Sequence, residues 1–156
     1  MNNIREELFG TLTLENAVDI TDPCYDKDVW CRMTAECKPG EYEGIAAMQD
    51  CGVWGIRVRS LSIRHTDLKN TPIDEIDMKP IGDIGVDAGL AGFFNNKPDF
   101  NDTEWFAFCD EIKEGKYWNL HDGIFSRSGY GDGCYEVYTS KDNDAFTILF
   151  IDEDEE

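Results

Sequence analysis

Alternation of apolar and polar positions runs through much of this chain and predicts a fold built from β-strands. Residues 29–37 alternate cleanly, and a turn at 38–41 leads into a second apolar run at 42–48. Two such runs joined by a short turn predict a β-hairpin. Residues 17–21 form a further strand candidate, which ends before Pro23 because proline lacks the donor that a strand ladder needs.

The longest alternating run covers residues 53–65. Trp54, Ile56 and Val58 share one face, but the apolar positions after them, Leu61 and Ile63, are one residue out of phase. An extra residue in one strand produces such a shift, so we expect a β-bulge near residues 59–60.

The last third of the chain predicts three more strands, at residues 123–126, 134–139 and 145–151. The third has apolar residues on both faces, which is typical of a central strand. Residues 7–14 alternate weakly and fit either an edge strand or a short helix that ends at Gly10. Residues 84–94 fit a short buried strand broken by tight turns, and residues 66–83 a long irregular connection.

One segment has helical periodicity. Asn101 and Glu104 form a capping-box pattern, and apolar residues follow at helical spacing up to Ile112, so we expect a helix at about residues 103–114. The fold class expected is mainly β (α+β): an antiparallel β-sandwich or partly open barrel with one amphipathic helix packed on it. We expect a single domain over residues 1–151, followed by an acidic tail at 152–156.

Composition supports a globular, soluble protein. The 156 residues are 41% hydrophobic and 12% aromatic, which is too apolar for a disordered chain. No export signal and no long apolar run is present, so we expect a cytoplasmic location. The six cysteines then predict reduced, mostly buried thiols, and the absence of a Cys-x-x-Cys pair argues against a zinc site.

Charge is the strongest global signal. The chain has 33 acidic and 14 basic residues, a net charge of −19, and the excess increases toward the C-terminus. Such a surface repels nucleic acids and anionic membranes and attracts basic protein surfaces. We therefore expect a basic, nucleic-acid-binding protein as partner. The acidic surface expected to meet it comprises Asp74, Glu75, Asp77, Asp152, Glu153, Asp154, Glu155 and Glu156.

A glycine-rich stretch at residues 128–133 is the least generic part of the sequence. Its Asp132, like Asp22 and Asp87, stands at a strand end beside glycine or proline. Such carboxylates commonly accept backbone N–H groups and hold a turn. Alternatively, if the strand ends share one rim, they would bind a divalent cation or a polar small molecule together with nearby tyrosines. The ligand-binding set is then Asp22, Tyr25, Asp87, Tyr130, Asp132 and Tyr135.

The sequence gives little basis for catalysis. Its two histidines, His65 and His121, fall in no nucleophile–base pattern, and no nucleophile elbow or phosphate-binding loop occurs. We expect neither catalytic residues nor a cofactor, and a Cys/His hydrolase stays as a distant alternative. Three arginines are unusual in so acidic a chain: Arg57, Arg59 and Arg64 either pair with neighbouring acids or form a small basic ligand-binding patch.

Four elements in fixed order resemble those of an uncharacterised family of small β-rich proteins of bacteria and their phages. They are Asp-Pro-Cys-Tyr at 22–25, Trp-Gly-Ile-Arg-Val at 54–58, Val-Asp-x-Gly at 86–89 and Gly-Asp-Gly-x-Tyr at 131–135. The resemblance implies a sandwich or barrel-like fold and no agreed activity. The family often has serine after the aspartate of the third element, where this chain has Ala88, so no hydroxyl role carries over.

Two function classes follow. The first is a non-enzymatic, phage-type binding protein whose carboxylates imitate nucleic-acid phosphates and which inhibits or sequesters a basic host protein, such as a CRISPR effector. Duplex DNA carries one charge per about 1.7 Å of axis, so such a mimic needs closely spaced carboxylates. The second class is a small-ligand or divalent-ion binding module that uses the aspartate-containing loops.

Overall fold

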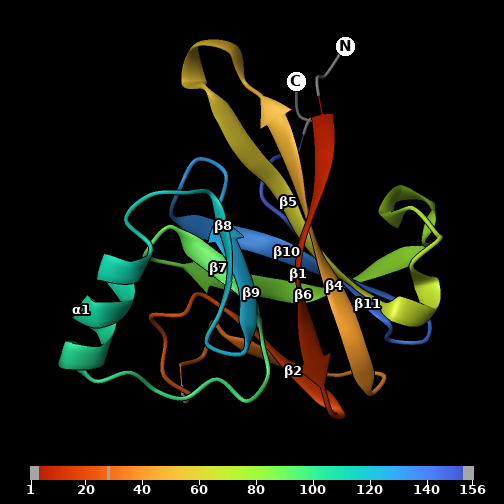
Figure 1. Ribbon diagram of the computed structural model, residues 1–156, viewed down its shortest axis with the longest axis horizontal. Coiled ribbons are helices and arrows are strands. Elements are labelled where there is room, and N and C mark those ends of the chain that lie inside the picture. The colour runs from red at the N-terminus through yellow and green to blue at the C-terminus, as the bar shows by residue number, and fades with distance from the viewer. Residues whose placement is uncertain (1–3, 28, 153–156) are drawn as a thin grey trace.

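The computed structural model describes residues 4–27 and 29–152, which form two antiparallel sheets (Figure 1). The larger sheet has the strand order β1-β4-β5-β11-β10-β6. Its strands are β1 (Ile4–Leu14), β4 (Gly40–Asp50), β5 (Ile56–His65), β6 (Met78–Val86), β10 (Gly133–Ser140) and β11 (Ala145–Leu149).

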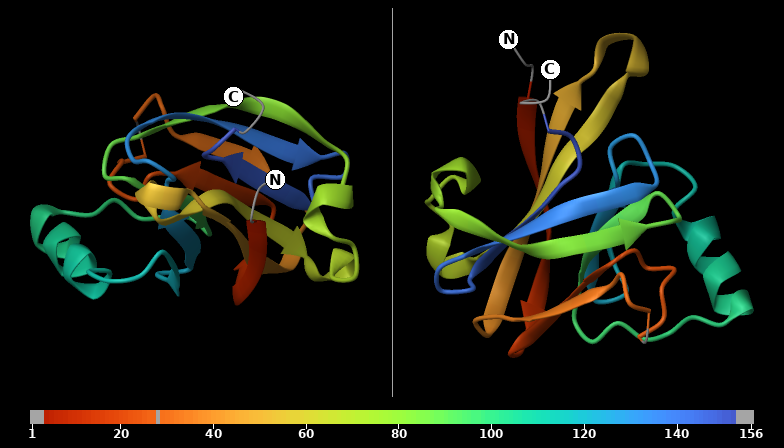
Figure 2. Two further views of the ribbon diagram at one scale, coloured as in Figure 1. Left: turned by 90° about the horizontal axis from the view of Figure 1, so that it is seen from above. Right: turned by 180° about the vertical axis from the view of Figure 1, so that it is seen from behind.

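The smaller sheet has the strand order β3-β2-β7-β9-β8. It consists of β2 (Ala17–Thr21), β3 (Met33–Glu36), β7 (Leu90–Phe94), β8 (Tyr117–Leu120) and β9 (Gly123–Arg127). Figure 2 shows the two sheets from above and from behind. The two separate antiparallel sheets are consistent with the expected β-sandwich, and the mainly β, α+β fold class is confirmed.

The core lies between the two sheets. Phe93 on β7 and Phe146 on β11 are fully buried, and their ring centroids are 6.4 Å apart, so they join the sheets directly. Leu61, Ile63 and Ile148 complete the same layer. Leu61 and Ile63 on β5, and Phe146 and Ile148 on β11, lie at alternate positions of their strands, as their spacing in the sequence indicated.

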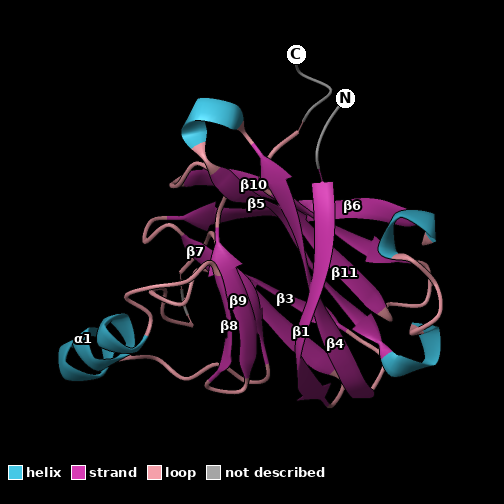
Figure 3. Cartoon of the chain, turned by 45° about the horizontal axis from the view of Figure 1, so that its top comes forward, coloured by secondary structure: helices cyan, strands magenta, loops and turns pink. Residues whose placement is uncertain are grey.

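Helix α1 (Asp102–Glu111) begins with the predicted capping box and packs beside the smaller sheet (Figure 3). The Asn101 side chain accepts a hydrogen bond from Glu104 N at 2.8 Å, and Glu104 accepts one from Asn101 N at 3.0 Å. The helix ends three residues earlier than expected, where Cys109 O accepts from Ile112 N. Phe108 and Ile112 are buried against Phe125 of β9.

The expected bulge in β5 is confirmed. Ala47 faces Ser60 and Met48 faces Val58, so Arg59 is the extra residue. The central position of β11 is also confirmed, because it pairs with β5 on one side and β10 on the other.

Several expected boundaries are wrong. Residues 29–37 contain only the short strand β3, because residues 29–32 form a turn in which Arg32 N donates to Val29 O. The irregular connection is shorter than expected and carries two 3₁₀ turns, η2 (Thr66–Leu68) and η3 (Ile73–Glu75). Strand β6 then begins at Met78 despite Pro80, which is tolerated because β6 is an edge strand.

Other differences concern turns and weak patterns. Residues 84–94 belong to two strands, β6 and β7, separated by a turn at 87–89, and the four-residue β8 was not expected. The first alternating run is an edge strand and not a helix; Gly10 takes a positive φ of 66° where the pairing of β1 with β4 shifts.

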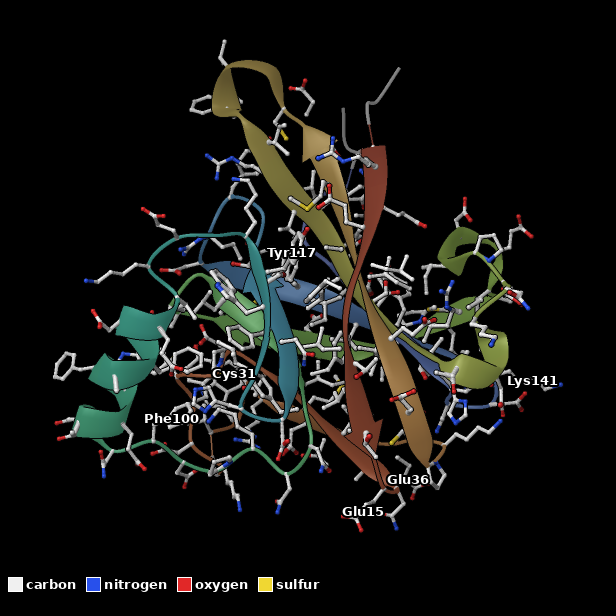
Figure 4. The ribbon with its side chains drawn as sticks, in the orientation of Figure 1. Glu15, Cys31, Glu36, Phe100, Tyr117 and Lys141 are labelled. Atoms are coloured by element: carbon white, nitrogen blue, oxygen red, sulfur yellow. The ribbon has the colours of Figure 1, made fainter. Side chains whose placement is uncertain are left out.

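A buried cation holds the loop that follows β2. Lys97 is almost fully buried, and its ammonium donates to Tyr25 O and Pro98 O and lies 4.6 Å from the centroid of Phe100, which faces α1 (Figure 4). Burial lowers the pKa of Lys97. Nearby, Arg32 and the buried Asp19 form an ion pair at 3.0 Å. The contacts of Lys97 fix Tyr25, in the loop that follows β2, against the segment that leads into α1.

Within the described residues, no helix is long and apolar enough to cross a membrane. All six cysteines are free thiols, as expected, but only two of them are buried. Cys31 and Cys37 are the buried pair, and Cys134 is exposed.

Candidate functional site

The three aspartates singled out by the sequence lie at neighbouring strand ends, and we call Asp22, Asp87 and Asp132 the aspartate rim. Asp22 follows β2 and is fully buried. Its Oδ1 accepts from Cys24 N at 2.9 Å, and its Oδ2 accepts from Asp87 N at 2.9 Å and from Ala88 N at 2.6 Å. Asp22 therefore ties the end of β2 to the turn between β6 and β7.

Burial raises the pKa of Asp22, and the three backbone donors oppose that rise. Both carboxylate oxygens are thus already used inside the protein, in an environment that disfavours the charged form. This geometry is what we expect of a carboxylate that holds a turn. Ligand binding by Asp22 stays a prediction.

The third member of the aspartate rim reaches the same turn from the other side. Ser128 N donates to Gly89 O at 3.1 Å, and Asp132 Oδ1 lies 4.0 Å from the point where a Cβ atom on Gly89 would stand. Asp87 and Asp132 are both exposed. The fold therefore brings the three aspartates together, with one buried and two facing solvent.

The predicted tyrosines point in different directions. The Tyr135 hydroxyl donates to Gly131 O at 2.5 Å, and its ring packs edge-on against Phe150. Tyr135 therefore closes the glycine-rich loop. Tyr130 instead lies under the guanidinium of Arg57, at 4.9 Å from the ring centroid. Burial raises the pKa of Tyr25, whose hydroxyl lies beside Cys31.

The described residues contain no group of three or more histidine, cysteine, aspartate or glutamate side chains arranged to hold a metal ion. The rim has only two exposed carboxylates, and its tyrosines turn inward or toward the hairpin. These observations give the ion-binding alternative no specific support, and the prediction stays untested.

The thiols and histidines do not form nucleophile–base pairs through the contacts that the structure records. Burial raises the pKa of Cys24 and of Cys109, so neither is a ready thiolate. His65 is buried, where its Nδ1 accepts from Asp67 N and its Nε2 faces Pro39 O. His121 pairs with Glu111 at 2.8 Å. The Cys/His hydrolase alternative gains no support from this arrangement.

The predicted acidic surface is only partly described. Asp74 and Glu75 lie on η3, Asp77 precedes β6, and all three are exposed. Asp152 is exposed too. The remaining predicted residues lie outside the described part of the chain; they are Glu153, Asp154, Glu155 and Glu156.

Two acids that the sequence analysis did not single out lie on the outer face of β6 and β10. Asp83 and Glu136 occupy directly opposite positions of these antiparallel strands. The Tyr138 hydroxyl donates to Glu136, and the pKa of Tyr138 rises to about 12 because of that bond, then burial and the nearby charges of Glu136, Asp152 and Asp83. We call Asp83, Glu136 and Asp152 the acidic cluster.

Of the acidic cluster, the sequence singled out Asp152 alone, because the meeting of Asp83 and Glu136 depends on strand pairing. Outward alternation of Glu136 and Tyr138 was readable from β10, but the register that sets Asp83 opposite Glu136 was not. The other exposed acids are spread widely: Glu15 and Glu36 lie at the far end of β1 and β3 (Figure 4), and others lie on α1. Acids are therefore not confined to one face.

The three arginines of β5 have different environments. Arg64 pairs with Glu43 at 3.1 Å and donates to Thr71 O, in agreement with the expected pairing. Arg59 donates to Gln49. Arg57 donates to the carbonyl oxygens of Trp54 and Gly129. They do not converge on one patch, because Arg57 points toward the glycine-rich loop and Arg64 toward the η2–η3 connection.

Comparison of the chain with models of protein families, with curated proteins and with solved structures found no match. The resemblance to the uncharacterised bacterial and phage family therefore stays a prediction.

Proposed function

We propose that this chain is a protein-binding module whose acidic surface engages a basic protein that handles nucleic acid, and that it acts by competing with the nucleic acid. The proposal extends to inhibition of a basic host defence protein, such as a CRISPR effector, because a strongly acidic phage-type chain suits that role. It rests on the charge of the whole chain, −19, and on the local geometry of the acidic cluster.

The observation that carries the proposal is the position of Asp83 directly opposite Glu136. Like charges facing each other across adjacent strands destabilise a sheet, so this pair has an electrostatic cost in the free protein. Asp152 adds a third charge close enough to affect the same tyrosine. A cationic partner would relieve the repulsion, which favours binding over a purely structural role.

The spacing also suits a phosphate mimic. Opposite residues of antiparallel strands have Cα atoms roughly 4.5–5.5 Å apart, and one strand of duplex DNA presents a phosphate about every 3.4 Å of axis. The acidic cluster thus presents negative charge at a density of the same order. Asp74, Glu75 and Asp77 precede β6 in the chain and continue the charge toward η3.

Affinity capture with a nucleic-acid challenge tests the proposal. The immobilised chain is incubated with a bacterial lysate at low salt, and retained proteins are eluted with duplex DNA and, separately, with high salt. The expected result is a basic nucleic-acid-binding protein that both treatments release, since ion pairs to carboxylates are screened by salt and displaced by phosphates.

The decisive variant combines Asp83→Asn, Glu136→Gln and Asp152→Asn, and should weaken retention at least tenfold. Its matched control removes the same number of charges at exposed sites away from the acidic cluster, through Glu15→Gln, Glu36→Gln and Glu41→Gln. Equal retention by both triple variants would argue for a diffuse charge effect, and retained proteins that DNA fails to release would rule out mimicry.

A further inference from the structure

The tip of the β4–β5 hairpin projects from the two sheets in Figure 1 and in the view from behind (Figure 2, right). We call residues 51–56 the hairpin tip; it contains η1 (Gly52–Trp54). Val53 is 95% exposed and Trp54 is 65% exposed, and Ile56 is exposed as well. The most prominent part of a strongly acidic protein is therefore apolar.

Hydrogen bonds among residues 50–55 hold the hairpin tip in one conformation. Cys51 N donates to Gly55 O, Gly55 N donates to Gly52 O, and Gly52 N donates to the Asp50 carboxylate. The φ values of Gly52 and Gly55 are +65° and +83°, and no atom lies within 4 Å of a Cβ placed on either, so the fold requires glycine there for conformation and not for space. Val53 and Trp54 are thus presented outward by a defined turn.

A second element supports the base of the hairpin. The Arg57 guanidinium donates to Trp54 O at 3.0 Å and to Gly129 O at 3.1 Å, and lies over the ring of Tyr130, which is 55% exposed. The glycine-rich loop therefore braces the hairpin tip. Tryptophan, tyrosine and arginine are the residues enriched at energetic hot spots of protein interfaces, and here one of each meets at a single exposed end.

A hollow with a mixed apolar and charged lining lies beside the hairpin. It has a volume of about 250 Å³ and is lined by Ile4, Arg5, Met48, Asp50 and Ile56. Arg5 is paired with Glu7 at 2.7 Å, and the Asp50 carboxylate accepts Gly52 N. The charges near the hairpin tip are thus of both signs, and Arg5 and Asp50 have partners within the chain.

The net charge of the chain limits which partners could bind the hairpin tip. Two copies with a net charge of −19 each repel one another, and an anionic membrane repels the chain as well. A protein with positive charge around an apolar pocket fits both features, because its pocket accepts Trp54 and Val53 while its positive charge is attracted by the net negative charge of this chain.

We propose that the hairpin tip is the hot spot of the binding surface: Val53 and Trp54 insert into an apolar pocket that lies beside the basic, nucleic-acid-binding groove of the partner. This inference rests on the proposed function for the identity of the partner. In this inference the apolar contact of the hairpin tip supplies affinity at short range, and the acids supply long-range attraction. Salt screens the attraction of the acids but not the apolar contact.

The test measures affinity for the DNA-displaceable protein, purified, by calorimetry at several salt concentrations. Val53→Ser with Trp54→Ser should weaken binding at least 30-fold at every salt concentration and leave the salt dependence unchanged. Trp30→Ser is the matched control, because Trp30 is 89% exposed in another loop, and it should change affinity less than twofold. Both variants alter exposed side chains, so an unchanged melting temperature is expected.

Affinity of the Val53→Ser, Trp54→Ser variant within twofold of wild type overturns the inference while the proposed function stands. If no DNA-displaceable protein is captured, the proposed function fails. The inference is then tested by crosslinking in living cells, with a photo-reactive amino acid placed at position 54. Protein adducts at position 54 but not at position 30 would support it. Absence of adducts, binding to phosphatidylcholine vesicles, or dimerisation lost in the double variant would each overturn it.

Discussion

Aspartates of the same chain serve two different purposes in the aspartate rim and the acidic cluster. Asp22 is fully buried, and three backbone N–H groups hold both of its carboxylate oxygens. Asp83 is exposed and faces Glu136 across two strands. A carboxylate that is saturated by internal donors stabilises the fold, whereas carboxylates that repel each other at the surface are better explained by an external partner. Neutralising each group should therefore change stability in opposite directions.

The largest effect is expected from Asp22→Ala. The change leaves three backbone donors without their acceptor, and an unsatisfied buried polar group costs about 1–3 kcal/mol, so we expect a loss of about 3 kcal/mol in the free energy of unfolding. Urea denaturation measures this loss directly. Asp87→Ala removes an exposed carboxylate from the same rim and should cost less than about 0.5 kcal/mol. Equal losses in the free energy of unfolding for Asp22→Ala and Asp87→Ala would contradict a structural role that belongs to the buried Asp22 and not to the exposed Asp87.

A pH series sharpens the assignment of Asp22. Its pKa is raised in the folded state, so between the ordinary aspartate value of about 3.9 and the folded value the native protein binds more protons than the unfolded chain. The contribution of Asp22 to stability should therefore decrease as pH rises through that window. Urea denaturation of wild type and Asp22→Asn at several pH values should show their difference shrinking with increasing pH; a difference that grows would mean that the backbone donors outweigh burial.

Titration of Tyr138 reports on the acidic cluster. Its pKa of about 12 should fall toward the ordinary value of about 10 when Glu136→Gln and Asp83→Asn remove the neighbouring charges. NMR of carbon-labelled tyrosine follows the ionisation. Tyr42 is an internal control, because burial is the main cause of its raised pKa, and its titration should not move. An unchanged pKa of Tyr138 would show that Glu136 and Asp83 do not raise it.

The smallest effect has the opposite sign to that of Asp22. Asp83→Asn with Glu136→Gln relieves a repulsion between opposite strand positions and should stabilise the protein by about 0.5 kcal/mol at low salt. Salt should abolish the gain by screening. Thermal unfolding at low and high salt measures both; destabilisation at low salt would mean that the pair supports the sheet and is not held at a cost.

The periodic parts of the fold were predictable because local pattern decides them. The capping box of α1, the bulge at Arg59 and the central place of β11 all follow from residue spacing within one segment. The errors arose where the pattern was short or a tertiary contact overrode it. Residues 29–32 alternate like a strand but form a turn beside the Asp19–Arg32 ion pair. Pro80 lies in an edge strand, although its segment was predicted to be an irregular connection.

The candidate surfaces were less predictable than the fold. Position beside glycine and proline singled out Asp22, Asp87 and Asp132, but it showed neither that they are neighbours nor that Asp22 is buried. The acidic cluster and the end formed by Trp54, Arg57 and Tyr130 both join segments more than 50 positions apart. Such meetings depend on strand order and register, which one sequence does not specify.

The most direct test of the account is the salt dependence of affinity for the captured basic protein, compared between wild type and the triple variant of the acidic cluster. We predict that wild-type affinity falls steeply with rising salt and that the variant shows a shallower dependence. An affinity that is indifferent to salt in wild type, or a dependence that is the same in both proteins, would contradict the claim that the acidic cluster is the working surface of this chain.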